Sequence, residues 1–338
     1  MDVTDAEMLI AMRPAQARIL FPGDRSEVSS RYRDLAKLWH PDISRDPRAA
    51  DVFASITDLH AVALRVLDGP TSFDERRFRT RDGRTFRLRH AVAHSTDFGE
   101  VLVGDRHIAH VVPSDLDDLS GRAAAWTPSF ADATMRDEME RFLPRVRSVL
   151  DTSEGRVFVE SKTPDQVLLR DLLKAGPIDP RHAAWMTTRL VNLACWLQWS
   201  GIAHGAIGPD TLLVSPEFHS VSITGPFLCA RSFGAVPHVL PERTLATAPR
   251  YAADGAQADA RLDPELVRQT VRETLGDPAG TRLAADPLFP KPFANWLLMP
   301  AAKGAQDDFP SWETARDASF GPRRFVRWDF DPAAVMAA

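Results

Sequence analysis

The chain has 338 residues, of which 44% are hydrophobic and 26% charged, and it carries a net charge of −5 at pH 7. This composition is ordinary for a soluble globular protein, and the net negative charge excludes a globally basic binder of nucleic acid or of anionic membranes. The length predicts two domains. The two cysteines, Cys195 and Cys229, give neither a disulfide framework nor a metal-ligand spacing, so we expect both to be buried small apolar residues.

The first residues and the apolar runs predict the cellular location. The chain begins Met-Asp-Val-Thr-Asp-Ala-Glu, which is too acidic for a signal or transit peptide. No apolar run approaches the roughly 18 residues that a membrane span requires. We therefore expect a cytoplasmic protein without a membrane segment.

The N-terminal segment has the pattern of several helices. A first helix is expected from residue 6 to about residue 21, interrupted near Pro14, and Asp24 or Ser26 can cap the next one. The apolar stripe of that next helix consists of Val28, Tyr32, Leu35 and Trp39. This spacing buries one face of a helix.

The other face of this helix is basic, and a proline marks its end. Arg33 and Lys37 are four residues apart and therefore share a solvated face. Pro41 disfavours helical geometry at His40, so the helix ends there and a polar turn comes next. The next helical pattern consists of Phe53, Ile56, His60, Ala63 and Leu67. The sequence predicts a helical hairpin that closes at about residue 68.

This hairpin resembles the J domain of DnaJ-type co-chaperones. Residues 32–36, Tyr-Arg-Asp-Leu-Ala, followed by His-Pro-Asp at 40–42, match the helix and loop of that family, and Phe53 and Ile56 match the start of its last long helix. The resemblance implies that a DnaK-type chaperone binds this face and is triggered to hydrolyse ATP. The implied chaperone-binding residues are His40, Pro41, Asp42, Arg31, Arg33 and Lys37.

The resemblance also implies a role for each of these residues. The three basic side chains would steer toward an acidic groove, Asp42 would pair with an arginine of the partner, and His40 and Pro41 would shape the loop. The chain departs from the family at residues 59–60, which are Leu-His, and Glu27 and Asp34 dilute the basic face. The alternative is that His-Pro-Asp is only a helix stop, in which the histidine suits the helix dipole and the aspartate caps the next segment.

A charged segment follows the hairpin. Its arginines are Arg76, Arg77, Arg79, Arg81 and Arg84. We interpret residues 69–84 as a solvated linker rather than a nucleic-acid-binding arm, because only Phe73 and Phe78 would offer stacking surfaces. We expect neither nucleic acid nor a membrane as a partner.

From residue 85 the pattern changes to short strands and later to helices. Strands are expected at 85–89, 101–103, 108–112 and 157–159, with a helix at 135–150. After Pro164 the chain is mainly helical, with a long apolar helix at 183–199.

Residues 201–214 carry a second motif, Gly-Ile-Ala-His-Gly-Ala-Ile-Gly-Pro-Asp-Thr-Leu-Leu-Val. A protein-kinase catalytic loop reads His-Arg-Asp-Leu-x-Pro-x-Asn. The residues in register with it are His204, Ile207, Pro209, Leu212 and Leu213. This part of the chain resembles a degenerate protein kinase, and residues 179–186 and 321–325 look similar to bacterial and phage chains that join a J-domain-like head to such a domain.

The expected fold class is therefore α+β and multidomain. An all-α, J-domain-like helical hairpin (1–68) and the linker (69–84) precede a bilobal kinase-like domain (85–330) and a tail (331–338). The kinase-like domain would have a small strand-rich lobe over about 85–163 and a larger helical lobe over about 164–330.

Phosphoryl transfer requires positioned carboxylates, one to accept the substrate proton and others to hold the metal. Ala206 occupies the position of the catalytic aspartate, Thr211 that of the metal-holding asparagine, and Thr224 that of the metal-binding aspartate. His110 best matches the lysine of the third strand, and its usual pKa is near 6.5. The phosphate-cradling loop at 93–100 carries only Gly99. We predict a pseudokinase without enzymatic activity, metal or cofactor.

Three further residues have two interpretations each. Glu138 matches the glutamate that pairs the strand-three lysine, but we favour a solvated helix charge. Asp263 is either the structural aspartate beneath the catalytic loop or a simple N-cap. His204 is expected to be a packing residue that braces the loop, rather than a catalytic or metal-binding histidine.

The leading interpretation is a DnaJ-type co-chaperone adaptor. The J-like hairpin would bind a DnaK-type chaperone and stimulate its ATPase, and the kinase-like domain would be a scaffold for an unknown protein client. The alternatives are an atypical ATP-dependent transferase and a structural component of a phage or bacterial assembly.

Overall fold

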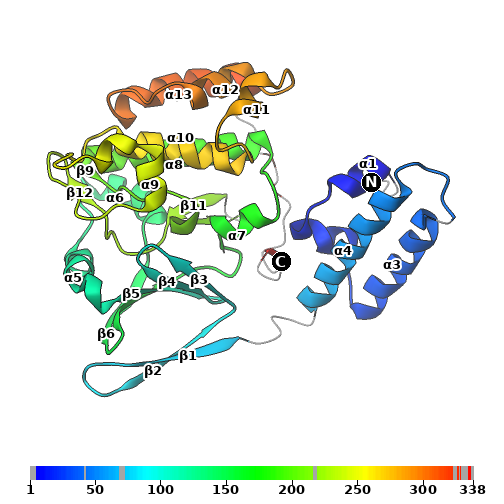
Figure 1. The fold of residues 1–338 in the computed structure, drawn as a ribbon, viewed down its shortest axis with the longest axis horizontal. Helices are drawn as coiled ribbons and strands as arrows, with labels where there is room; N and C mark the ends of the chain where they lie inside the picture. The colour runs from blue at the N-terminus through cyan, green and yellow to red at the C-terminus, as the bar shows by residue number, and fades with distance from the viewer. Residues whose placement is uncertain are drawn as a thin grey trace.

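The computed structural model describes residues 5–41, 43–67, 73–215, 219–322, 326, 328, 334 and 335. Over these residues the chain is a mixed α+β protein, in which N-terminal helices are followed by a strand-rich region and then by further helices (Figure 1). Among these residues we find no helix with both the length and the apolar character that crossing a bilayer demands.

The N-terminal helices form a small unit with its own core. They are α1 (Ala6–Ala11), η1 (Pro14–Gln16), α2 (Ala17–Leu20), α3 (Arg25–Trp39) and α4 (Ala49–Leu67). The Asp24 carboxylate accepts hydrogen bonds from the backbone N–H of Ser26 and Glu27, and Glu27 Oε2 accepts from Asp24 N–H at 2.8 Å. This capping box begins α3 with Asp24 as the N-cap, one of the two residues that the sequence offers for that position. The Tyr32 ring stacks on His60 at 4.1 Å between centroids, which joins α3 to α4.

The charged segment after α4 is a β-hairpin, so the prediction of a linker at 69–84 is wrong over residues 74–84. Strand β1 (Asp74–Arg79) pairs with β2 (Thr85–His90), with Phe78 opposite Phe86. Apolar residues alternate with arginines, which suits a strand with one buried face. Asp82 and Gly83, whose φ is +86°, allow the turn.

A five-stranded antiparallel sheet follows, with the strand order β3-β4-β5-β7-β6. Its strands are β3 (Val92–Thr96), β4 (Gly99–Val103), β5 (His107–Pro113), β6 (Val146–Thr152) and β7 (Gly155–Ser161). Between β5 and β6 lie η2 (Ser114–Leu116), α5 (Asp117–Ala125), α6 (Ala133–Met139) and η3 (Glu140–Phe142). The predicted strands at 101–103, 108–112 and 157–159 all lie in this sheet.

The predicted helix at 135–150 is wrong in its second half. The helical turns end at Phe142, and residues 146–152 form β6 against β7. Pro144 disfavours helical geometry at Leu143, which ends the helical segment. The apolar residues Val146, Val149 and Leu150 have helical spacing, so the pairing of β6 with β7 overrides the local pattern.

The remaining chain is mainly helical around the largest core. Its strands are β8 (Val167–Leu168), β9 (Ile202–Ala203), β10 (Leu212–Ser215), β11 (Ser220–Ile223) and β12 (Arg231–Ser232). Its helices are α7 (Leu169–Lys174), α8 (Pro180–Trp199), η4 (Pro209–Thr211), α9 (Glu242–Thr247), η5 (Pro249–Ala252), α10 (Leu262–Thr274), α11 (Thr281–Ala285), α12 (Lys291–Leu298) and α13 (Ala305–Phe320). The predicted long helix is α8, which packs against α10 and α13. The buried Arg268–Asp308 ion pair joins α10 to α13.

The N-terminal unit lies beside the rest of the molecule rather than within it (Figure 1). Arg13 packs on Gly176, where an added Cβ would come within 3.1 Å of the Arg13 guanidinium carbon. Near the C-terminus, Ala334 is buried in the N-terminal core and Val335 in the large core. These contacts leave α3 on the side of the unit that faces away from the body (Figure 1).

Candidate functional site

The first candidate site is the solvated face of α3. Arg33 and Lys37 are exposed, and Arg33 Nε donates to the carbonyl of Ser29 at 3.2 Å. Arg31 is half-buried, and its Nε has no hydrogen-bond partner among the described residues. Asp34 shares the exposed surface, whereas Glu27 is held in the capping box. Lys37, in the last turn, also suits the negative end of the helix dipole.

The turn after α3 is organised by His40. Its backbone is extended (φ −62°, ψ 129°), and its carbonyl accepts hydrogen bonds from Ile43 N–H and Ser44 N–H, both at 2.9 Å. The His40 ring meets the edge of Phe53 on α4, with 5.2 Å between centroids. Pro41 is exposed at the turn. Asp42 lies outside the described residues, so the predicted pairing role of its carboxylate remains a sequence-based prediction.

The second candidate site is a cleft between the five-stranded sheet and the helical region. Among the residues that line it are five of the six positions matched to kinase functional residues: His110, His204, Ala206, Thr211 and Thr224. Its cavity volume is about 110 Å³, below the roughly 300–1,000 Å³ of typical small-molecule sites. Glu138 is exposed on α6 and is not among the lining residues, in keeping with a solvated helix charge.

A buried polar chain closes the inner end of this cleft. His110 Nε2 lies 3.0 Å from Thr224 Oγ1, and that hydroxyl donates to Glu160 Oε2 at 2.8 Å. Glu160 Oε1 accepts from Gly225 N–H at 2.8 Å. Burial lowers the pKa of His110 to about 4 and raises the pKa of Glu160 to about 7.

Glu160 was not identified from the sequence. The signal was present, because a single acid stands in the otherwise apolar 157–160 run of β7. Its side chain is buried and ties the loop after β11 to the sheet. A carboxylate buried this deeply needs hydrogen-bond partners, and here they come from a loop more than 60 residues further along the chain.

Asp263, on α10, fixes the start of the loop at 204–211. Its two carboxylate oxygens accept hydrogen bonds from His204 N–H at 2.7 Å and Gly205 N–H at 2.9 Å. Because these donors lie in a distant loop, Asp263 is a brace and not an N-cap. Burial raises its pKa to about 6. His204 packs edge-on against Phe227, and burial lowers its pKa to about 4, which agrees with a packing role.

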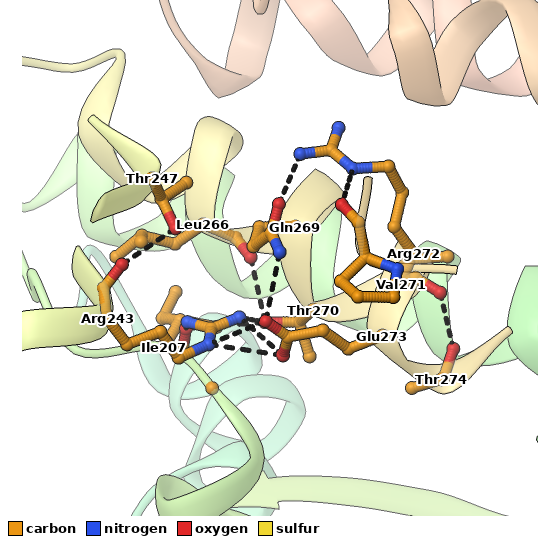
Figure 2. A network of polar contacts seen from close by, with 12 residues as sticks. Ile207, Arg243, Thr247, Leu266, Gln269, Thr270, Val271, Arg272, Glu273 and Thr274 are labelled. Atoms are coloured by element: carbon orange, nitrogen blue, oxygen red, sulfur yellow. Dashed lines mark hydrogen bonds and ion pairs between the residues drawn. The ribbon is translucent and has the colours of Figure 1, made fainter. Parts of the chain in front are cut away.

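Arg243 on α9 fixes the same loop from a second side. Its guanidinium donates to the carbonyl of Ile207 at 2.9 Å, to Thr270 Oγ1 at 2.9 Å and to the Glu273 carboxylate (Figure 2). The closest Arg243–Glu273 contact is 2.9 Å. The planar fork of arginine can make all of these bonds at once.

Asp97, Glu100 and Asp210 are among the residues that line the cleft. The three positions that the sequence matches to the aspartates and the asparagine of a kinase carry Ala206, Thr211 and Thr224, none of which is a carboxylate. The nearby Asp210 is engaged by Arg170 at 3.0 Å. Within the described residues no group of three or more histidine, cysteine or acidic side chains could hold a metal ion.

The two cysteines differ in their burial and in their position relative to the cleft. Cys229 is buried and lines the cleft, whereas Cys195 on α8 is half-buried, so the prediction of full burial is correct only for Cys229. Burial raises their pKa values to about 12 and about 11, respectively. Both thiols are therefore protonated at neutral pH and poor nucleophiles.

The fold and sites define an α+β protein with an N-terminal helical unit that precedes a sheet and a helical body. No family model matches the chain. The chain is similar to the "Chaperone protein DnaJ" of Methanothermobacter thermautotrophicus, with 46% identity over 39 residues. The match covers 12% of this chain and 10% of that protein. This short similarity hints at a J domain.

Proposed function

We propose that the chain is a DnaJ-type co-chaperone adaptor that binds a DnaK-type chaperone through α3 and the turn after it. The observation that carries the proposal is the α3–α4 hairpin, which exposes Arg33 and Lys37 beside the turn that His40 holds. The short similarity to a DnaJ protein supports the same region. Exposed cations of one helix face suit electrostatic steering toward an acidic surface.

The proposed partner of the remaining chain is a protein client, bound by a catalytically dead kinase-like domain. Support comes from the order of elements and from one cleft that gathers His110, His204, Ala206, Thr211 and Thr224. Where a kinase would use a lysine and an aspartate, this chain has the buried His110–Thr224–Glu160 chain. Such a chain joins the sheet to the loop after β11 and puts a neutral histidine where a kinase would have the lysine that binds phosphate.

The binding step is tested with charge reversal on α3. We expect Arg33→Glu/Lys37→Glu to weaken binding to an ATP-loaded DnaK-type chaperone at least tenfold in biolayer interferometry, chiefly through the association rate. The control is Arg181→Glu/Lys303→Glu, which makes the same change in net charge on exposed positions of the helical body. Equal binding by the α3 variant and the unaltered protein would contradict the proposal.

A further inference from the structure

The hairpin β1–β2 presents an arginine-rich face that the co-chaperone proposal does not use. Residues 73–90 contain seven arginines and three acidic residues, in a chain whose net charge is −5. Figure 1 shows the hairpin projecting from the edge of the five-stranded sheet at the bottom of the molecule. The hairpin joins the body near its turn, where Arg81 N–H bonds the carbonyl of Asp151 and Ser153 N–H bonds that of Arg79.

The strand alternation sorts the side chains of the hairpin onto two faces. The inner face carries Phe78, Phe86 and Leu88, of which Phe78 and Leu88 are buried. The outer face carries Glu75, Arg77, Arg79, Thr85, Arg87 and Arg89, all of them exposed. Residues two apart on a strand are about 7 Å apart, so the four arginines form one compact array.

The array is electrostatically costly in the isolated protein. Arg77 lies directly opposite Arg87 in the register, and like charges in that position destabilise a hairpin. Glu75 offsets part of the charge through its 2.7 Å ion pair with Arg77. For Arg79 and Arg87, the described part of the chain offers no carboxylate within ion-pair distance. Removing either should therefore relieve repulsion rather than break a contact.

We propose that this outer face binds the phosphate backbone of double-stranded DNA, with the two-stranded ribbon lying at the major groove. A two-stranded β-ribbon fits the major groove of B-form DNA, whereas the deep, narrow major groove of duplex RNA excludes it. Single-stranded nucleic acid is bound chiefly by aromatic stacking. Phe78 and Phe86 belong to the inner face, and the Phe73 ring before β1 is already covered by the Arg89 guanidinium, 5.1 Å from its centroid. Binding is independent of base sequence, since the outer face offers mainly guanidinium groups.

The hairpin structure favours the interpretation of this segment as a nucleic-acid-binding arm over that of a solvated linker. As a linker, its arginines would be dispersed by solvation along a flexible chain. As a paired ribbon, they are held on one face at fixed spacing. The inference is independent of the co-chaperone proposal, because it uses neither α3 nor the cleft.

The test measures fluorescence anisotropy of a labelled 20-base-pair DNA duplex at 50 and 200 mM salt. If four arginines contact phosphates, affinity of the full chain should fall about 100-fold between these concentrations. For Arg79→Gln/Arg87→Gln, binding at 50 mM should be weaker and the fall should shrink to about tenfold. The control Arg181→Gln/Lys303→Gln removes the same charge from exposed positions elsewhere and should behave as the unaltered protein.

Three results would overturn the inference. They are undetectable duplex binding at 50 mM salt, unchanged binding by Arg79→Gln/Arg87→Gln, and equal affinity for a single-stranded oligonucleotide or an RNA duplex. The thermal midpoint of the double variant is measured in parallel. We expect it to be equal or higher because the Arg77–Arg87 repulsion is removed, so lost binding would not reflect lost folding.

Discussion

At the scale of single residues, the informative feature is Glu160, a carboxylate buried against Thr224 and Gly225. Its two acceptor oxygens are both satisfied, which explains how it can be buried. Its pKa is raised to about 7 by burial, so its ionised form opposes folding. Neutral His110 completes the chain.

Glu160→Gln should change how stability depends on pH. A raised carboxyl pKa gives stability that is present below the unfolded value near 4.3 and is lost as pH rises through 7. The variant lacks this loss. The thermal midpoint of the variant minus that of the unaltered protein should therefore increase from pH 5 to pH 8. The lowered pKa values of His110 and His204 reduce the stability of the fold as pH falls below about 6.5. This loss is the same in both proteins.

The comparison therefore uses the difference between the two proteins at each pH, measured by scanning fluorimetry. The amide introduced by Glu160→Gln can still accept from Gly225 N–H and can donate to Thr224 Oγ1, so the network survives. Glu138→Gln, which neutralises an exposed acid on α6, is the matched control. A difference that stays constant from pH 5 to pH 8 would show that the buried carboxylate does not titrate in this range.

At the scale of elements, the loop at 204–211 is held from two sides. Asp263 on α10 accepts hydrogen bonds from its backbone N–H groups. Arg243 on α9 donates to the carbonyl of Ile207 (Figure 2). Side chains of two different helices thus fix the backbone of this loop. This rigidity suits a scaffold, since a preformed surface costs less conformational entropy on binding.

Arg243 and Glu273 should be energetically coupled. Both side chains are mostly buried, so removing one leaves the other partly desolvated and unpaired. We expect Arg243→Ala and Glu273→Ala each to destabilise the protein, and the double variant to lose less than the sum, with a coupling free energy of about 1 kcal/mol. Urea unfolding of the four proteins measures it. Strict additivity would mean that the fork to Ile207 and Thr270 accounts for the whole effect of Arg243.

The elements also show which parts of the fold could be predicted. The helices α3 and α8 have long apolar stripes, and the strands β4, β5 and β7 are apolar runs between turns, so local pattern was sufficient. Strand β2 was predicted at 85–89, but its partner β1 was missed because the density of arginine suggested solvation. Strand β6 was missed because its pairing with β7 is a tertiary event.

The same limit applies to the sites. The helix, turn and basic face at 31–41 are local features and can be predicted from sequence. The cleft depends on residues more than 100 positions apart, such as His110 and Thr224, and was reached only through the resemblance. The role of Glu160 could not be predicted even through the resemblance, because the burial of one acid depends on partners that only the folded chain supplies.

At the scale of the whole molecule, the chain joins a helical unit to a larger body that contains a cleft. We expect ATP with Mg²⁺ to leave the thermal midpoint unchanged. A ligand at 100 times its dissociation constant adds about 2.7 kcal/mol to stability, enough to move the midpoint by several degrees. A Mg²⁺-dependent rise would contradict the pseudokinase proposal and favour an atypical transferase.

The co-chaperone proposal requires that the N-terminal unit trigger a chaperone, and single-turnover ATP hydrolysis measures that step. A DnaK-type chaperone preloaded with ATP is mixed with this protein or with its Asp42→Asn variant, which removes one charge from the turn after α3. We expect acceleration by the unaltered protein and little or none by the variant. If neither protein accelerates hydrolysis by the cognate chaperone, or if both do so equally, the co-chaperone proposal is wrong.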